Sequence, residues 1–190
     1  MKDFSLSKTY YFDRNSDPAS EAFGLRLRDM IAHVDKYYDC IVLFCIGTDK
    51  ATGDSLGPMC GTFMKQNIPD IPVFGTLAKP VHALNIRSSL KHLYEKYEHP
   101  LVIAIDAALG QKNDVGLVTL SDSHIFPGIG VNKKLPAIGD ISITGIVNVS
   151  GRDAGALLLN TRLYFVIKLV EYICEGICQA VTPHPDPCIP

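Results

Sequence analysis

The sequence predicts an α/β protein, a three-layer α/β/α sandwich built around a mostly parallel sheet. Two uncharged runs, residues 40–46 (CIVLFCI) and 101–105 (LVIAI), are rich in β-branched residues, and each is followed by a segment that contains an aspartate. Such runs are typical of strands that are buried on both faces, as in parallel sheets. Segments with helical spacing of apolar residues separate the strands, which favours right-handed βαβ units with helices on both faces.

Local signals assign the remaining elements. Residues 1–17 show no periodicity and contain several turn formers, so we expect an irregular N-terminal arm that packs at an edge. Residues 182–190 (TPHPDPCIP) hold four prolines, which excludes a regular helix in this Pro-rich tail. Apolar periodicity predicts helices over residues 17–37, 55–66, 82–97 and 156–180, and strands over 40–46, 72–74, 101–105, 115–120 and 141–149.

Composition places the chain among ordinary globular proteins and argues against several partners. The 190 residues, 47% hydrophobic and 20% charged, suffice for one full core, so we expect a single domain over residues 1–190. The net charge of −2 and the lack of a long Lys/Arg run provide no electrostatic footprint for nucleic acid or an anionic membrane. No apolar stretch reaches the roughly 18 residues of a membrane span. The N-terminus lacks the apolar core of a signal peptide, so we predict a cytoplasmic protein.

The six cysteines form no recognisable metal or redox motif. No CxxC pair or metal-finger spacing connects them. We interpret them as small buried hydrophobes in a reducing compartment, and no motif supports the alternative of a catalytic cysteine. They are Cys40, Cys45, Cys60, Cys174, Cys178 and Cys188.

Two aspartates that are distant in the sequence are expected to meet at one edge of the sheet. In a common doubly wound order the first strand lies between the second and the third, and the carboxyl ends of the first and third face one crevice. Asp54 lies in the loop after strand 40–46, and Asp106 follows strand 101–105. Two carboxylates held close together cannot both ionise cheaply, so one keeps a proton and the pair can act as acid and base on a water.

The residues alone leave other interpretations of these aspartates open. Asp54 stands just before a predicted helix and suits an N-cap, while Asp106 suits a carboxylate that bonds loop amides. Alternatively, both hold a divalent metal together with the neutral imidazole of His124, which lies in the loop after strand 115–120.

Two further residues are candidates for the same crevice. Lys79 and His82 follow strand 72–74 and can line it from the second loop. The region around Gly47 contains neither GxGxxG nor the lysine of a P-loop, so a dinucleotide or nucleoside triphosphate site has little support.

Three segments resemble, in the same order, motifs of the germination protease of spore-forming bacteria. Residues 47–58 end in TGDSLGP, similar to that family's GxGNxxxTPDALGP loop. Residues 104–107 (AIDA) resemble its AIDAL motif, and residues 121–130 (SDSHIFPGIG) resemble its SDTGIHPGSG loop. Over roughly residues 40–170 the chain is more similar still to the smaller YyaC-type sporulation proteins, for which the segments GDSLGP, HALN, SDSHIFPGIGV and GDISITGIVNV are typical.

The resemblance implies a phosphorylase/hydrolase-like fold shared with hydrogenase-maturation endopeptidases, and an atypical aspartic-type peptidase activity. The two essential aspartates of the germination protease correspond to Asp54 in TGDSLGP and Asp106 in AIDAA. The chain departs from that family's pattern at three positions, because Thr48 replaces an asparagine, Gly53 a proline and Phe126 a histidine.

We therefore predict a sporulation- or germination-associated endopeptidase in which Asp54 and Asp106 are the catalytic residues. No cofactor is expected. The alternative is a metal-dependent peptidase of the maturation type, because hydrogenase-maturation peptidases use a Glu/Asp, Asp, His set that Asp54, Asp106 and His124 resemble.

Four further residues are predicted to bind substrate or to stabilise an oxyanion: Gly47, Thr48, Ser123 and Gly128. The resemblance implies a protein or peptide substrate, of which small acid-soluble spore proteins are the example, a location inside the forespore or spore, and a homo-oligomer. A protein of a different class also fits the sequence, namely a non-catalytic spore protein that binds a peptide or partner in the same crevice.

Overall fold

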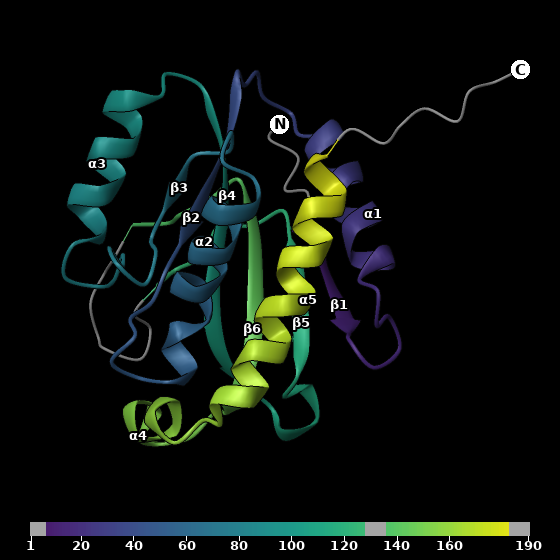
Figure 1. Cartoon of the computed structure of the whole chain (residues 1–190), viewed down its shortest axis with the longest axis vertical. Helices are drawn as coiled ribbons and strands as arrows, with labels where there is room; N and C mark the ends of the chain where they lie inside the picture. Colours follow the sequence, from purple (N-terminus) through teal and green to yellow (C-terminus); the bar gives the residue numbers. More distant parts are fainter. Residues whose placement is uncertain (1–6, 128–135, 183–190) are drawn as a thin grey trace, which may run out of the picture.

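A six-stranded sheet forms the centre of the protein (Figure 1). The computed structural model describes residues 7–127 and 136–182. The strands are β1 Thr9–Asp13, β2 Cys40–Cys45, β3 Val73–Phe74, β4 Pro100–Gly110, β5 Leu117–Ser121 and β6 Ile141–Val149. They lie in the order β1-β5-β6-β4-β2-β3; β3, β2, β4 and β6 are parallel, and β5 is antiparallel to both of its neighbours. The predicted α/β fold with a mostly parallel sheet is confirmed, and β2 lies between β3 and β4 as expected.

Helices cover both faces of this sheet. They are α1 Glu21–Ala32, α2 Leu56–Asn67, α3 Ile86–Lys96, α4 Ala154–Leu159 and α5 Leu163–Val181. Leu43 and Cys45 of β2 belong to the core that α1, α2 and α5 share with the sheet, whereas Val42 and Phe44 belong to the core under α3. Because successive side chains alternate between faces, this uncharged strand is buried on both sides. Figure 1 shows α2 and α5 side by side and α3 well apart from them.

No helix in residues 7–127 and 136–182 has both the length and the apolar character needed to span a membrane.

The N-terminal segment differs from the expected irregular arm. Thr9–Asp13 forms strand β1, which pairs with β5 from Thr9 opposite Ser121 to Asp13 opposite Leu117. Its Phe12 ring packs edge-on against Phe23 of α1, with ring centroids 5.4 Å apart. Threonine and aromatic residues suit a half-buried strand, so the composition TYYFD was the overlooked signal.

The long C-terminal helix expected over residues 156–180 is two helices, α4 and α5. The break falls where the buried Thr161 hydroxyl donates to the Leu157 carbonyl oxygen (2.9 Å) and accepts from Asn148 Nδ2 (3.3 Å). Arg162 then has extended backbone angles, with φ −70° and ψ 126°. The chain turns at this point, so α4 packs beside the end of β6 instead of continuing the line of α5.

The cysteines in the described residues are free thiols, in agreement with the sequence-based interpretation. Cys45, Cys60 and Cys174 are fully buried in the core that β2, α2 and α5 share. Burial is the main cause that raises the pKa of the Cys45 thiol above its usual range, so this thiol stays protonated and packs as a small hydrophobe.

Candidate active site

The loop after β2 is tied to the loop after β3. Ile46 and Val81 form an isolated parallel bridge, and the Gly47 N–H donates to the Val81 carbonyl oxygen (2.8 Å). Gly47 has φ +136°, and a Cβ at this position would lie 2.0 Å from the Asp54 carbonyl oxygen. Only glycine fits this turn, because it tolerates positive φ and leaves room for the backbone of residue 54.

Asp54 points back into this loop. It lies in a short 3₁₀ helix, η1 (Gly53–Ser55), directly before α2, and its Oδ2 accepts a hydrogen bond from the Thr48 N–H (2.8 Å). The N-cap position of α2 is Ser55, and no side chain caps that helix. The N-cap interpretation of Asp54 is therefore wrong.

The sequence predicted Asp106 at the end of a strand, but Asp106 lies within strand β4. Strand β4 continues to Gly110, with Asp106 opposite Thr144 of β6. On its other side β4 loses its partner, since β2 ends with Cys45 opposite Ile105. Asp106 is thus the first residue of β4 beyond the end of β2, on the side where the Asp54 loop begins. Its Oδ1 accepts from the N–H of Ala107 (2.8 Å), the following residue in the same strand.

The charge of Asp54 acts on the carboxyl group of Asp106. Burial raises the pKa of Asp106 well above its usual range, and the negative charge of Asp54 raises it further, against the lowering effect of the Ala107 N–H. Burial also raises the pKa of Asp54, but the Thr48 N–H and the charge of His82 act against this rise. The surroundings therefore favour the protonated form of Asp106 more strongly than that of Asp54.

His82 lies near the pair, whereas Lys79 is not among the described groups that act on either aspartate. His82 directly follows Val81, whose bridge to Ile46 places it beside the Asp54 loop, and its charge favours the carboxylate form of Asp54. Lys79 lies in an exposed turn whose backbone bonds to Thr76 in both directions (3.1 Å each).

The two predicted oxyanion donors at the start of the loop are already engaged. The Gly47 N–H bonds to Val81, as described above, and the Thr48 N–H bonds to Asp54. The Thr48 hydroxyl accepts from the Lys50 N–H (3.3 Å). These bonds hold the loop and orient Asp54, and the oxyanion role of Gly47 and Thr48 stays a prediction.

The predicted site residues after β5 have partners of their own. The hydroxyl groups of Ser123 and Ser121 lie 2.8 Å apart and hydrogen bond, and His124 Nδ1 contacts the Gly139 carbonyl oxygen. Within the described residues neither Ser123 nor His124 bonds to Asp54 or Asp106. Gly128, also predicted to bind substrate, lies outside the described residues.

The donors that a metal would need do not come together in the described part of the chain. No group of three His, Cys, Asp or Glu side chains there is arranged to hold an ion, so the set Asp54, Asp106 and His124 is not assembled. The residues that the structure describes do not fit the metal-dependent alternative.

Helix α4 forms a wall of the site that the sequence did not indicate. A Cβ on Gly53, the neighbour of Asp54, would lie 2.9 Å from Leu158 of α4 and 2.9 Å from the Thr161 hydroxyl. Asn148, near the end of β6, donates to the Leu157 carbonyl oxygen (2.9 Å) and anchors α4 there. A polar amide at the end of an apolar strand was the available signal.

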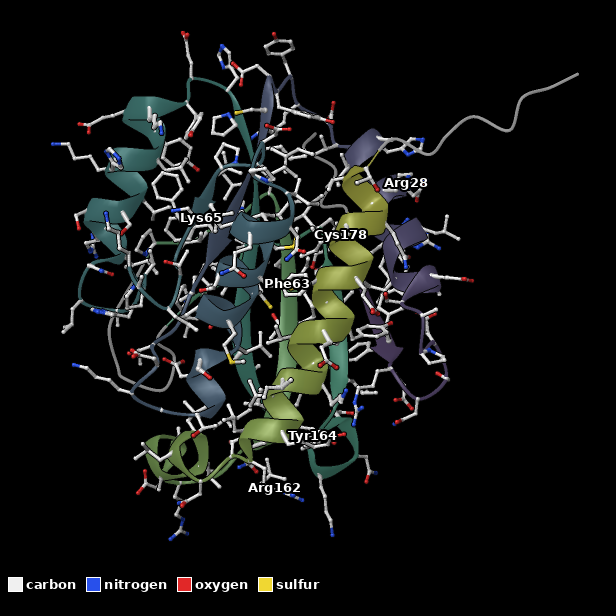
Figure 2. All side chains as sticks on the ribbon, viewed as in Figure 1. Arg28, Phe63, Lys65, Arg162, Tyr164 and Cys178 are labelled. Carbon is white, nitrogen blue, oxygen red and sulfur yellow. The ribbon has the colours of Figure 1, made fainter. Side chains whose placement is uncertain are left out.

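A separate hollow lies between α2 and α5. Phe63 and Asn67 of α2 and Cys178 of α5 line it, and its volume is about 420 Å³. Figure 2 shows Phe63 and Cys178 on these neighbouring helices. Neither Asp54 nor Asp106 lines this hollow, so it does not belong to the candidate active site.

The family match spans the whole of this site. Residues 12–176 match the family model described as Protein of unknown function (DUF1256). This chain belongs to that family. A relative, "Uncharacterized protein YyaC" from Bacillus subtilis (strain 168), is 45% identical over 138 residues, which make up 72% of this chain and 67% of the relative. Among solved structures, the chain is similar to the crystal structure of a NiFe hydrogenase maturation protease HycI from Thermococcus kodakarensis KOD1, with 17% identity, a TM-score of 0.49, and coverage of 80% of this chain and 98% of that one.

Proposed function

We propose that this DUF1256 protein is a peptidase of the atypical aspartic type, in which Asp54 and Asp106 activate a water. The observation that carries the proposal is the unequal environment of two neighbouring carboxyl groups. The charge of Asp54 adds to burial in raising the pKa of Asp106, whereas the Thr48 N–H and His82 counteract the effect of burial on Asp54. Two carboxyl groups that differ in this way can serve as base and acid at the same pH.

The chemistry balances with these two groups alone. The Asp54 carboxylate takes a proton from a water as its oxygen attacks the peptide carbonyl carbon, and the Asp106 carboxylic acid gives its proton to the carbonyl oxygen. The tetrahedral diol then loses one hydroxyl proton to Asp106 while Asp54 passes its proton to the amide nitrogen. The C–N bond breaks, and both residues return to their starting forms.

The biological setting is part of the same proposal. The resemblance of TGDSLGP, AIDA and SDSHIFPGIG to motifs of the germination protease supports a role in sporulation or germination, inside the spore, with small acid-soluble spore proteins as substrates. We also propose that the protein is a homo-oligomer. Tyr164 is 63% exposed at the start of α5, beside Arg162 in Figure 2, and α5 is a candidate contact. Light scattering coupled to size exclusion tests the oligomeric state.

Substitution of either aspartate tests the activity. We expect Asp54→Asn and Asp106→Asn each to lower cleavage of small acid-soluble spore proteins by about 10²- to 10⁴-fold, the usual contribution of a general acid or base. Asp49→Asn removes an exposed carboxylate from the same loop and is expected to keep wild-type activity. Wild-type cleavage by either catalytic-site variant rules out the mechanism.

One observation favours a second candidate function. Both backbone N–H groups that were predicted to stabilise an oxyanion, those of Gly47 and Thr48, are already bonded within the protein. A non-catalytic protein that binds a peptide in this crevice needs no such donors. It predicts that calorimetry detects peptide binding by wild-type protein while mass spectrometry detects no cleavage product at any pH.

A further inference from the structure

The segment after β3 presents a histidine to the aspartate pair in a fixed position. Val81 is buried and pairs with Ile46, which extends the contact between β2 and β3 by one bridge. The Gly47 N–H donates to the Val81 carbonyl oxygen beside this bridge. Thr48 follows Gly47 in the first segment, and His82 follows Val81 in the second. Since Thr48 bonds Asp54, the backbone brings His82 to the same turn.

The ring of His82 is oriented by its own loop. The Leu84 N–H lies 3.3 Å from its Nδ1 and points at it, which orients the ring within the loop. The backbone is fixed as well, because the His82 N–H donates to Asn85 Oδ1 (2.8 Å) and Asn85 Nδ2 donates to the Pro80 carbonyl oxygen (2.9 Å). A half-buried side chain held in this way has few alternative positions.

His82 is the favourable charge in the surroundings of Asp54. The buried group facing Asp54 is Asp106 on β4, which repels a second negative charge. Asp49 and Lys50 of the same loop are exposed to solvent, and α4, which packs on this turn, carries no charged side chain. No hydrogen bond joins the His82 ring to Asp54 in the described residues, so the two groups act on each other through space.

We propose that His82 is the third residue of the site, a positioning residue that keeps Asp54 in its carboxylate form while Asp106 holds the proton. This inference rests on the proposed function and adds one residue, His82, to the two that it already uses. Asp106 is the acid, Asp54 is the base, and His82 stabilises the base without touching the scissile bond. A positive charge on the His82 ring lowers the pKa of Asp54, which favours the carboxylate that serves as the base.

The decisive experiment follows the Asp54 carboxyl carbon by NMR during a pH titration. In the Asp106→Asn protein, which removes the coupling between the carboxyl groups, we expect His82→Asn to move the Asp54 titration to higher pH. The asparagine can still accept from the Leu84 N–H, so the loop keeps its bond. His82→Lys restores a positive charge and should return the titration toward its starting point. His124→Asn is the matched control and should leave it unchanged.

The result is independent of whether a substrate is known. If cleavage is found, the low-pH limb of kcat/KM should move to higher pH in His82→Asn, with His82→Lys closer to wild type. An unchanged Asp54 titration in both His82→Asn and His82→Gln, with folded spectra, overturns the inference. An absence of cleavage by wild-type protein contradicts the proposed function alone, because the shift of the Asp54 titration is measured without turnover.

Discussion

His82 and His124 differ in the strands that deliver them, and the difference explains which histidine belongs to the aspartate pair. His82 follows β3, which is parallel to β2, so its loop leaves the sheet beside the loop of Asp54. His124 follows β5, which is antiparallel to β6, and it contacts Gly139, two residues before β6 begins. The carboxyl end of an antiparallel strand lies where its parallel neighbours start. Strand direction therefore decides which polar loops meet.

The largest effect is expected from a side chain on Gly47, in the Asp54 loop, which lies beside the loop of His82. Gly47→Ala forces a residue with a Cβ into φ +136° and places that Cβ 2.0 Å from the Asp54 carbonyl oxygen. We expect a loss of about 3 kcal/mol in the free energy of unfolding, from backbone strain and the clash together. Urea denaturation followed by circular dichroism measures it.

Gly139, whose carbonyl oxygen contacts His124, provides the control. Gly139 has φ +90°, and a Cβ there would lie 2.7 Å from the Cβ of Ala104. Gly139→Ala should therefore also destabilise the fold, yet leave the Asp54 titration where it is in the wild type. If Gly47→Ala is as stable as the wild type, the tie between the loops after β2 and β3 is not as the structure has it.

A smaller effect distinguishes the protonated aspartate from an ordinary one. The folded-state pKa of Asp106 is raised above its unfolded value, so its contribution to stability is fully present below the unfolded pKa of about 3.9 and is lost as pH rises through the folded pKa. Relative to Asp106→Asn, the wild type should lose stability as pH rises from about 4, by roughly 1.4 kcal/mol for each unit of pKa difference. Urea denaturation at several pH values between about 4 and about 8 measures the trend.

The exposed Asp49 separates this effect from the general loss of a carboxylate. Asp49→Asn lies in the same loop, outside the buried surroundings that act on Asp106. Its stability difference from the wild type should vary much less with pH. A pH-independent difference between wild type and Asp106→Asn would mean that Asp106 is not the proton holder.

The strands and the two aspartates were predictable from the sequence because they depend on short, local patterns. The uncharged runs that became β2 and β4 announce strands buried on both faces, and parallel neighbours bring the following residues to one edge. The turn at Thr161 and the direction of β5 were not predictable in the same way. Thr161 breaks a helical pattern through a hydrogen bond with Asn148, 13 residues away, which no periodicity reveals.

The sequence named His82 as a candidate for the crevice, but the contact that brings it to the Asp54 loop was not predictable. Its motif, HALN, contains an imidazole, an amide and an exposed leucine, which also suit an ordinary turn before a helix. What makes it part of the site is the bridge between Val81 and Ile46, a contact across 35 positions of the chain. A resemblance to known motifs pointed instead to the loop of His124, because motif comparison records residue types and not the edge at which a strand ends.

The smallest effect is expected in the loop after β5, which carries Ser123 and His124. Ser123→Ala removes the hydroxyl that bonds to Ser121 (2.8 Å) and should cost about 0.5–1.5 kcal/mol in the free energy of unfolding, the net value of a typical hydrogen bond. Because Ser123 bonds neither aspartate among the described residues, any cleavage activity should stay within about twofold of the wild type, against the 10²-fold or larger loss expected for Asp54→Asn. The same assay that compares the aspartate variants measures it. A loss of about 10²-fold in Ser123→Ala would show that the loop after β5 reaches the reacting groups during turnover. That result would contradict the conclusion that the loop after β3, and not the loop after β5, lies beside the aspartate pair.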